Sequence, residues 1–346
     1  MSPSPPIRVV VVDDSAFVRK VVREMLSRHP AIDVVGAARD GEEALELVAA
    51  LKPDVVTCDL AMPVLDGVGF VRRQMAACPV PILVLTASPH DGEQAMEALG
   101  AGAIDLVQKP TALANDELLG LHEQLVEKVK AAARISMKAL PPVFPAVFRS
   151  RIARLSLKTD IVVLGISTGG PQALRRLLPL FPADFPVPIA MVLHMPVGYT
   201  ALFAEKLNEL CALEVREARE GDVLRPGLAL LAQAGRHLQF RRTAAGETVA
   251  QLTMQPIEKI HRPAVDVLFA SAARIFEERV LAVVMTGMGD DGREGAGWIK
   301  ARGGTVLTEA EASCTIYGMP RSVVEAGLSD AAYPLETMAQ GIIENL

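Results

Sequence analysis

The chain has 346 residues, half of them hydrophobic, which is enough for two domains that each bury a core. Its net charge of −6, without a long basic run, argues against a nucleic-acid partner. No run approaches about twenty apolar residues, and no signal peptide is visible, so we expect a cytoplasmic protein without membrane insertion. The scattered cysteines have no metal-type spacing, and we expect them to be reduced.

The first part of the chain alternates short apolar runs with helical patterns. Such alternation predicts a parallel sheet with helices on both faces, in which polar residues at the carboxyl ends of strands gather at one edge. The strand-like runs are Ile7–Val12, Val34–Val35, Asp54–Cys58, Ile82–Leu85 and Ile104–Val107, and helical patterns occur at Val18–Leu26, Glu42–Leu51, Val68–Ala76, Glu93–Leu99 and Glu117–Ala133.

Polar residues follow these strands in a pattern that suits phosphoryl transfer. Asp13 and Asp14 follow the first strand, Asp59 the third, Thr86 the fourth and Lys109 the fifth. Carboxylates gathered at one place repel each other unless a cation lies among them, and oxygen ligands of this kind suit Mg²⁺. Asp59 could then accept a phosphoryl group, with Thr86 and Lys109 holding its oxygens. Helix capping explains any one of these residues but not the whole set.

Four short motifs in this part of the chain carry a family resemblance. They are Val12–Ser15, Cys58–Pro63 with Asp66-Gly67, Leu85–Ala87 and Lys109-Pro110. Through them, residues 7–125 resemble the receiver domain of two-component response regulators. The resemblance implies that Asp59 is the phosphoacceptor, with Asp14 a direct Mg²⁺ ligand and Asp13 a ligand through water. Leu106 stands where many receivers have an aromatic residue, so we do not expect an aromatic switch coupled to Thr86.

A proline-rich segment follows the last of these helices. Leu140–Pro145 cannot continue a helix, and we expect a semi-rigid linker that packs through apolar residues such as Phe144 and Phe148. We therefore divide the chain into a first domain at residues 1–125, a linker at 126–158 and a second domain at 159–346.

The second domain begins with a strand, a glycine-rich turn and a helix. Ile161–Leu164 has the composition of a buried strand, and Pro171–Leu178 is typical of the first turns of a helix. Ser167 lies between them within the spacing G-x-S-x-G, where glycines let a substrate approach the serine hydroxyl. Alternatively, this serine only caps the helix.

A histidine and two acids follow later strands of the same domain. Val187–Leu193 ends at His194, and Val280–Met285 leads into the segment Thr286–Gly292, which contains Asp290 and Asp291. A parallel sheet would bring these residues to the edge that holds the serine, as a nucleophile, base and carboxylate require. Glycine-flanked amides in the last segment could form an oxyanion hole. Taken singly, the histidine could be a surface residue and the acids helix caps.

Further motifs extend the resemblance to essentially the whole chain. They are Gly165–Pro171, His194–Pro196 with Tyr199-Thr200, His261–Phe269, Thr286–Gly292 and Ala312–Pro320. With the receiver motifs, they resemble the chemotaxis protein-glutamate methylesterases, the CheB family. The resemblance implies Ser167 as nucleophile, His194 as base, Asp291 rather than Asp290 as the acid, and the Met288 N–H in the oxyanion hole. For His261 we favour a helix-capping role over contact with substrate.

The resemblance implies an α/β protein: a flavodoxin-like, five-stranded parallel receiver joined by a linker to a doubly wound, mainly parallel esterase domain. It implies hydrolysis of glutamate methyl esters on chemoreceptors at receptor arrays, with glutamine deamidation by the same acyl chemistry. A chemotaxis histidine kinase would phosphorylate Asp59; Mg²⁺ belongs to the receiver, and the esterase step needs no cofactor. From the domain order, we expect the unphosphorylated receiver to cover the Ser167 edge and inhibit the enzyme. An acyl hydrolase with another substrate and a non-catalytic docking module remain alternatives.

Overall fold

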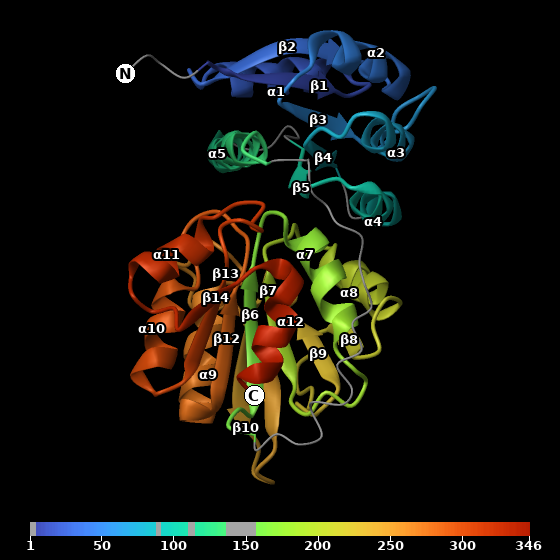
Figure 1. Cartoon of the computed structure of the whole chain (residues 1–346). Coiled ribbons are helices and arrows are strands. Elements are labelled where there is room, and N and C mark those ends of the chain that lie inside the picture. Colours follow the sequence, from blue (N-terminus) through green and yellow to red (C-terminus); the bar gives the residue numbers. More distant parts are fainter. Residues whose placement is uncertain (1–4, 88–90, 110–114, 136–156) are drawn as a thin grey trace. The chain divides into compact units, whose positions relative to one another are not determined.

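The computed structural model describes residues 5–87, 91–109, 115–135 and 157–346. The chain divides into two compact units, Met1–Pro141 and Pro142–Leu346, which we describe one at a time (Figure 1). Most of the expected linker, including Leu140–Pro145 and Phe148, lies outside the described residues.

The N-terminal unit carries the motifs that resemble a receiver domain, and we call it the receiver unit. It contains a five-stranded parallel sheet in the order β2-β1-β3-β4-β5. This order is that of the flavodoxin-like fold, as predicted. The strands are β1 (Ile7–Val12), β2 (Ile32–Ala38), β3 (Val55–Asp59), β4 (Ile82–Thr86) and β5 (Asp105–Gln108), and the helices are α1 (Ala16–Ser27), α2 (Gly41–Leu51), α3 (Gly67–Ala77), α4 (Gly92–Ala101) and α5 (Asn115–Ala132).

Local sequence explains where these helices begin. Ser15, Asp40 and Asp66 each precede a helix, and each side chain accepts a hydrogen bond from a backbone amide in its first turn. The strands are apolar runs buried on both faces, as expected for a parallel sheet covered by helices. Helix α5 packs Leu125 and Val129 into the receiver core and continues to Ala132, past the boundary expected at residue 125.

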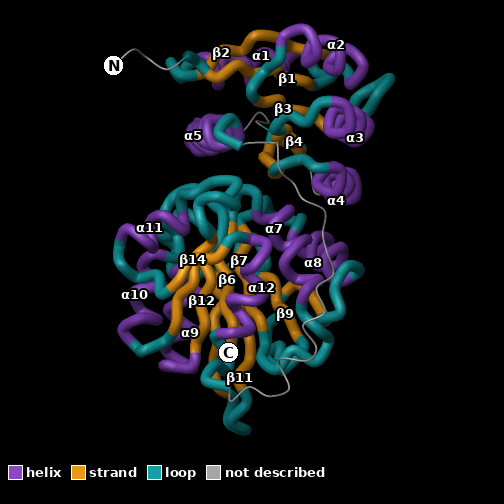
Figure 2. Tube along the Cα trace, in the orientation of Figure 1, coloured by secondary structure: helices purple, strands orange, loops and turns teal. Residues whose placement is uncertain are grey.

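The C-terminal unit carries the motifs that resemble the methylesterases, and we call it the esterase unit. It has a seven-stranded sheet in the order β14-β13-β12-β6-β7-β9-β8, and every pairing in it among the described residues is parallel. Helices cover both faces, with α7 and α12 on one and α9 and α10 on the other (Figures 1 and 2). The elements are β6 (Ile161–Ile166), α7 (Gly170–Leu177), β7 (Ile189–Leu193), α8 (Thr200–Asn208), β8 (Glu214–Glu217), β9 (Leu228–Leu231), α9 (Val265–Phe276), β12 (Val280–Val284), α10 (Arg293–Ala301), β13 (Thr305–Glu309), α11 (Met319–Glu325), β14 (Ala331–Tyr333) and α12 (Leu335–Glu344).

Strand β6 is first in the chain but lies in the middle of this sheet. The strands that follow it directly extend the sheet from β7 on one side, and the later strands extend it from β12 on the other. The carboxyl ends of β6, β7 and β12 therefore meet where the strand order reverses, which is the usual place for a site in an open α/β sheet.

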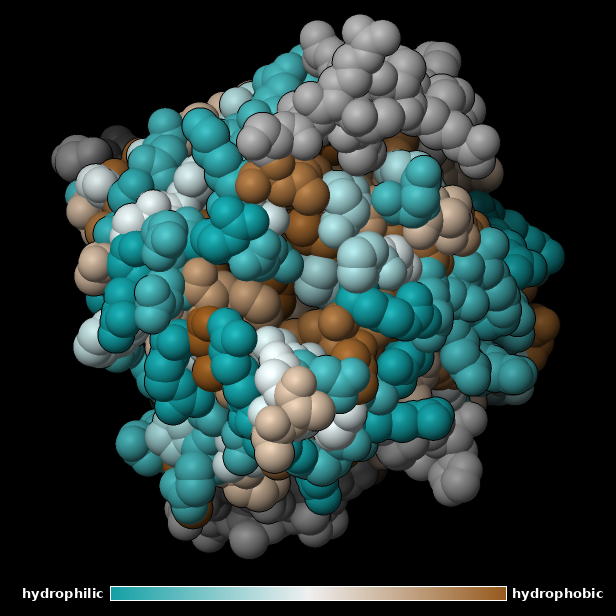
Figure 3. All heavy atoms as spheres, turned by 90° about the horizontal axis from the view of Figure 1, so that it is seen from below, coloured by the Kyte–Doolittle hydropathy of each residue, from teal (hydrophilic) through white to brown (hydrophobic). Residues whose placement is uncertain are grey.

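An antiparallel hairpin packs against α9. It consists of β10 (His237–Arg242) and β11 (Thr248–Thr253), and Phe240 N donates to Ser271 Oγ of α9 at 2.8 Å. No helix among the described residues has the length and hydropathy that a membrane span requires. The face in Figure 3 is mainly hydrophilic, with hydrophobic residues in small separate groups.

Candidate active site

Ser167 lies in a tight turn between β6 and α7. Its amide donates to Thr286 O at 3.0 Å, and its carbonyl accepts from Gly170 N at 2.7 Å. Gly169 follows with φ of +80°, and a Cβ at that position would overlap the side chain of Thr315. Gly169 is also the cap residue of α7, which has no side-chain cap. The serine hydroxyl is therefore not used for helix capping.

The side chains of Ser167, His194 and Asp291 form one hydrogen-bonded chain. His194 Nδ1 lies 3.1 Å from Ser167 Oγ, and His194 Nε2 lies 2.9 Å from Asp291 Oδ2. Both the serine and the aspartate are 8% exposed. The network assigns the tautomer in which Nε2–H donates to the carboxylate and Nδ1 accepts the serine proton. This is the arrangement that a hydroxyl nucleophile, a general base and an orienting acid require.

Asp291 is held by the first amides of α9. Val265 N donates to its Oδ2 at 2.8 Å, and Asp266 N donates to its Oδ1 at 2.9 Å. Burial opposes ionisation, but His194 and these amides outweigh it and lower the pKa of Asp291 to about 2. The carboxyl is thus ionised at neutral pH. The Asp290 side chain is instead exposed and forms an ion pair with Arg293 at 2.7 Å.

The helix-capping role favoured for His261 is wrong. The cap residue of α9 is Ala264, and Asp291 is the side chain that binds the first amides of the helix. The His261 ring instead stacks on the ring of His194, with centroids 4.1 Å apart and planes 19° apart. His261 is therefore part of the surroundings of the candidate base.

The loop after β12 lies against Ser167. A Cβ at Gly287 would lie 2.8 Å from Ser167 Cβ, and Gly287 O accepts hydrogen bonds from the amides of Gly318 and Met319. Among the described residues, the Met288 N–H donates to no protein acceptor. An N–H of this kind is available to a negatively charged oxygen.

A buried acid that sequence reasoning missed ties these loops together. Glu309, the last residue of β13, is fully buried and accepts hydrogen bonds from Thr286 N and Ser313 Oγ, each at 2.9 Å. Thr286 Oγ1 in turn donates to Thr168 O at 3.0 Å and accepts from Ile316 N at 2.9 Å. The sequence signal that could have identified Glu309 is an acidic residue at the end of an apolar, strand-like run.

Glu309 should make the stability of the esterase unit depend on pH. Burial is the main cause that raises its pKa from 4.5 to about 7. Between these values the folded protein holds a proton that the unfolded chain has lost, so the stabilisation is present below pH 4.5 and is lost as the pH rises through about 7. The total loss corresponds to about 3 kcal/mol.

Glu309→Gln mimics the protonated carboxyl and should remove this pH dependence. The measurement is urea unfolding at several pH values across this window, followed by the fluorescence of Trp298, the single tryptophan of the chain. Glu311→Gln, at an exposed neighbour, serves as the control and should keep the slope. An unchanged slope in Glu309→Gln would contradict the assignment.

The receiver unit brings its predicted polar residues together at the ends of β1, β3 and β5. One carboxylate oxygen from each of Asp13, Asp14 and Asp59 lies within 4.8 Å of the others. Lys109 Nζ lies 2.9 Å from Asp13 Oδ2 and 2.7 Å from Asp59 Oδ1. Burial raises the pKa of Asp59, and the contact with Lys109 opposes this rise. Thr86 is buried at the end of β4.

These carboxylates fit a divalent cation. Three oxygen donors on two neighbouring strand ends match the ligand preference of Mg²⁺. Asp13 is fully buried, and its Oδ2 lies 2.9 Å from Lys109 Nζ, so this carboxylate already faces one positive charge. Leu106 is fully buried in β5, and its carbonyl accepts from Lys128 Nζ at 2.8 Å.

Comparison with known proteins places both units in families. The family model "CheB methylesterase" matches residues 162–342, and the model "Response regulator receiver domain" matches residues 9–120. A curated relative from Myxococcus xanthus, protein-glutamate methylesterase/protein-glutamine glutaminase 5, is 52% identical over 96% of each chain. The chain belongs to the CheB methylesterase family.

Other CheB proteins agree. The protein-glutamate methylesterase/protein-glutamine glutaminase of Halalkalibacterium halodurans is 41% identical over 97% of each chain. The crystal structure of the CheB methylesterase catalytic domain of Thermotoga maritima is 38% identical, with a TM-score of 0.53, and covers 54% of this chain and 99% of that one. The family, the fold class and the enzyme class predicted from the sequence, a protein-glutamate methylesterase and protein-glutamine glutaminase with a receiver domain, are confirmed.

Proposed function

We propose that the chain hydrolyses glutamate methyl esters on chemoreceptors with a triad of Ser167, His194 and Asp291, and that phosphorylation of Asp59 relieves inhibition by the receiver. The observation that carries this proposal is the continuous hydrogen-bonded chain from Ser167 Oγ through His194 to Asp291, with separations of 3.1 and 2.9 Å. Membership of the CheB family supports the substrate class.

The proposed reaction begins when Ser167 Oγ attacks the ester carbonyl and His194 Nδ1 takes its proton. Asp291 stabilises the resulting imidazolium through Nε2, and the Met288 N–H binds the oxyanion. His194 then returns the proton to the leaving methoxide, which departs as methanol and leaves an acyl-serine. Water, deprotonated by His194, then attacks the acyl carbonyl, the bond to Ser167 Oγ breaks, and His194 returns the proton to Oγ as the glutamate is released. With a glutamine substrate, the same steps release ammonia.

The chain's own groups supply each part of the proposed esterase reaction, so we propose no cofactor for it. In the receiver, residues 1–125, we propose that Asp13, Asp14 and Asp59 hold Mg²⁺. The metal ion would neutralise charge that develops during phosphoryl transfer. Asp59 would accept the phosphoryl group from a chemotaxis histidine kinase, and Thr86 and Lys109 would contact its oxygens.

We further propose that the segment after α5, up to residue 158, links the receiver to an esterase domain over residues 159–346. Within this organisation, the phosphorylation state of Asp59 sets access of the receptor substrate to Ser167. Such a substrate places the enzyme in the cytoplasm, at receptor arrays.

The function is tested by methanol release from membranes that carry methylated chemoreceptors. The assay compares the purified chain with and without a small-molecule phosphodonor and Mg²⁺. We expect release that increases with the phosphodonor. Release that does not change with the phosphodonor would support the proposed esterase activity and overturn its proposed regulation by the receiver. A folded protein that releases no methanol would overturn the substrate assignment.

Asp59→Asn should abolish the response to the phosphodonor. The amide is not a nucleophile for the phosphoryl group, so the ratio of release with and without phosphodonor should fall to about one. Asp54→Asn is the control, because Asp54 lies just before β3 and accepts only from the backbone amide of Arg8, at 2.8 Å, among the interactions described for it. It should respond like the parent chain. A full response in Asp59→Asn would contradict the role of Asp59.

A further inference from the structure

Helices α9 and α10 both begin beside Asp291, and the first amides of each helix bind a carboxylate from the start of the other. The first amides of α9, those of Val265 and Asp266, donate to the Asp291 carboxylate at 2.8 and 2.9 Å. The amides that open α10, those of Gly292 and Gly295, donate to Asp266 Oδ1 at 2.9 and 2.8 Å. Each helix N-terminus thus binds a carboxylate from the other helix's opening segment, where unpaired amides and the helix dipole favour an anion.

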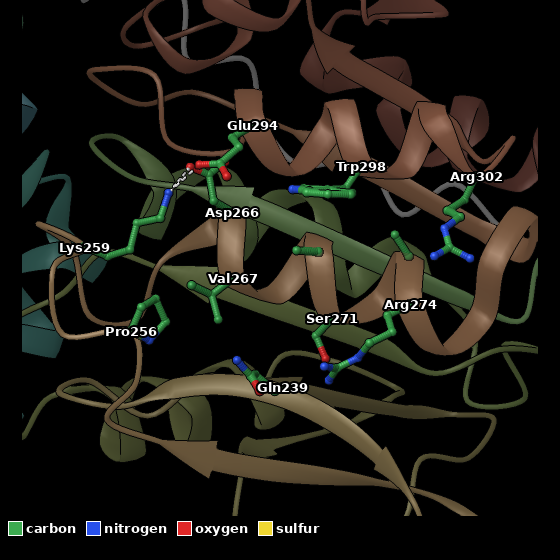
Figure 4. A pocket seen from close by; sticks show the side chains of 12 residues that line it. Gln239, Pro256, Lys259, Asp266, Val267, Ser271, Arg274, Glu294, Trp298 and Arg302 are labelled. Atoms are coloured by element: carbon green, nitrogen blue, oxygen red, sulfur yellow. Dashed lines mark hydrogen bonds and ion pairs between the residues drawn. The ribbon is translucent and has the colours of Figure 1, made fainter.

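The second oxygen of Asp266 is also engaged. Lys259 Nζ lies 3.1 Å from Asp266 Oδ2 and 2.7 Å from Glu294 Oε2. Figure 4 shows these side chains at one end of a cavity of about 370 Å³ that is lined by α9, α10 and β10. Because both oxygens of Asp266 bind partners on separate segments, its side chain joins the start of α10 to the start of α9.

The hydrogen bonds that Asp266 accepts from the start of α10 restrict the backbone next to Asp291. Asp291 directly precedes Gly292, whose φ of +101° is a conformation that favours glycine. The Asp291 carboxylate must reach the α9 amides and His194 Nε2 at the same time. Without the Asp266 carboxylate, Gly292 and Gly295 would lose their acceptor, and the backbone that carries Asp291 could shift relative to α9.

We propose that Asp266 is a positioning residue of the esterase, which holds Asp291 within hydrogen-bond distance of His194. This inference rests on the proposed triad. Asp266 acts through Asp291 and does not contact the ester.

Asp266→Ala should slow the chemistry without weakening substrate binding. A small displacement of an orienting group can cost about 10²-fold, so we expect kcat for methanol release to fall by about that factor with KM within about twofold of the parent value. Labelling of Ser167 by a fluorophosphonate, which needs no receptor, should slow by a similar factor. Asp266→Asn keeps Oδ1 as an acceptor for both glycine amides and should recover most of the rate.

Asp222→Ala is the matched control. The Asp222 side chain is 13% exposed, as is that of Asp266, and it too accepts from a backbone amide and a cation, Arg219 N and Arg216 Nη1, each at 2.7 Å. It should match the parent in kcat and in labelling. Circular dichroism and Trp298 fluorescence report the folded fraction of each variant, and the rates are expressed per folded molecule.

A double-mutant cycle separates positioning from an independent role. If Asp266 acts only through Asp291, Asp266→Ala should cause no further loss of labelling in the Asp291→Ala background. An equal slowing in both backgrounds, or parent-like labelling of folded Asp266→Ala and Asp266→Asn, would overturn the proposal while leaving the triad intact. No labelling of the folded parent chain at Ser167 would overturn the triad, and the role of Asp266 with it.

Discussion

Ser167→Ala should reduce methanol release from methylated chemoreceptors by about 10⁵- to 10⁶-fold, to the level of the uncatalysed reaction plus whatever the oxyanion site contributes. The Ser167 hydroxyl is the nucleophile of the proposed reaction, so without it no acyl-serine can form. The substitution removes one hydrogen bond, of 3.1 Å, and should change the free energy of unfolding by only about 1 kcal/mol.

The measurement pairs methanol release with thermal unfolding of the same preparation. Ser329→Ala provides the control, because Ser329 is a half-buried serine of the same unit whose hydroxyl lies 2.9 Å from Thr308 Oγ1. It should keep parent-like release. Release by folded Ser167→Ala within tenfold of the parent, a rise of at most about 1.4 kcal/mol in the activation free energy, would show that another group is the nucleophile.

Asp291→Asn should lower kcat by about 10⁴-fold, while Asp290→Asn should change it by less than about twofold. Asp291 Oδ1 accepts from Asp266 N–H, and Oδ2 accepts from both His194 Nε2–H and Val265 N–H, so the amide nitrogen of asparagine would oppose an N–H donor at either position. At the Oδ2 position it would oppose two of them. The imidazole would lose the partner that fixes its tautomer. The Asp290 side chain forms an exposed ion pair with Arg293, and such pairs contribute little.

The Asp290→Asn variant serves as the control for the Asp291→Asn variant. The two variants carry the same net charge and differ by one position in the chain, so a difference between them reports the site alone. Methanol release and fluorophosphonate labelling should give the same ranking. Equal activity of the two variants would refute the choice of Asp291 as the acid.

The order of strands and helices could be predicted from the sequence because parallel strands that are buried on both faces consist of short, continuous runs of apolar residues. Ile161–Leu164 and Ile7–Val12 are examples, and both became central strands. Strand-end positions then brought Ser167, His194 and Asp291 to one edge. The spacing itself did not decide between Asp290 and Asp291; that choice came from the family motif.

The contacts that support the site could not be predicted from the sequence. Glu309 and Thr286, and likewise Asp266 and Gly292, bind each other across long stretches of chain, and no local periodicity records such pairs. His261 was misjudged for the same reason. Its neighbour in sequence is the start of α9, but its partner in space is His194, and Asp291 had already taken the helix amides.

The position of β6 in the sheet also determines when, during synthesis of the chain, the site can form. Because the strand that carries Ser167 lies between its immediate successor β7 and the late strand β12, the chain must be made at least as far as Asp291 before the three side chains can meet. Every strand of the receiver unit has left the ribosome by then, and domains generally fold as units in the order of their synthesis. A newly made chain therefore possesses its receiver sheet before the proposed triad can form, and no incomplete chain that stops before Asp291 contains all three of these residues.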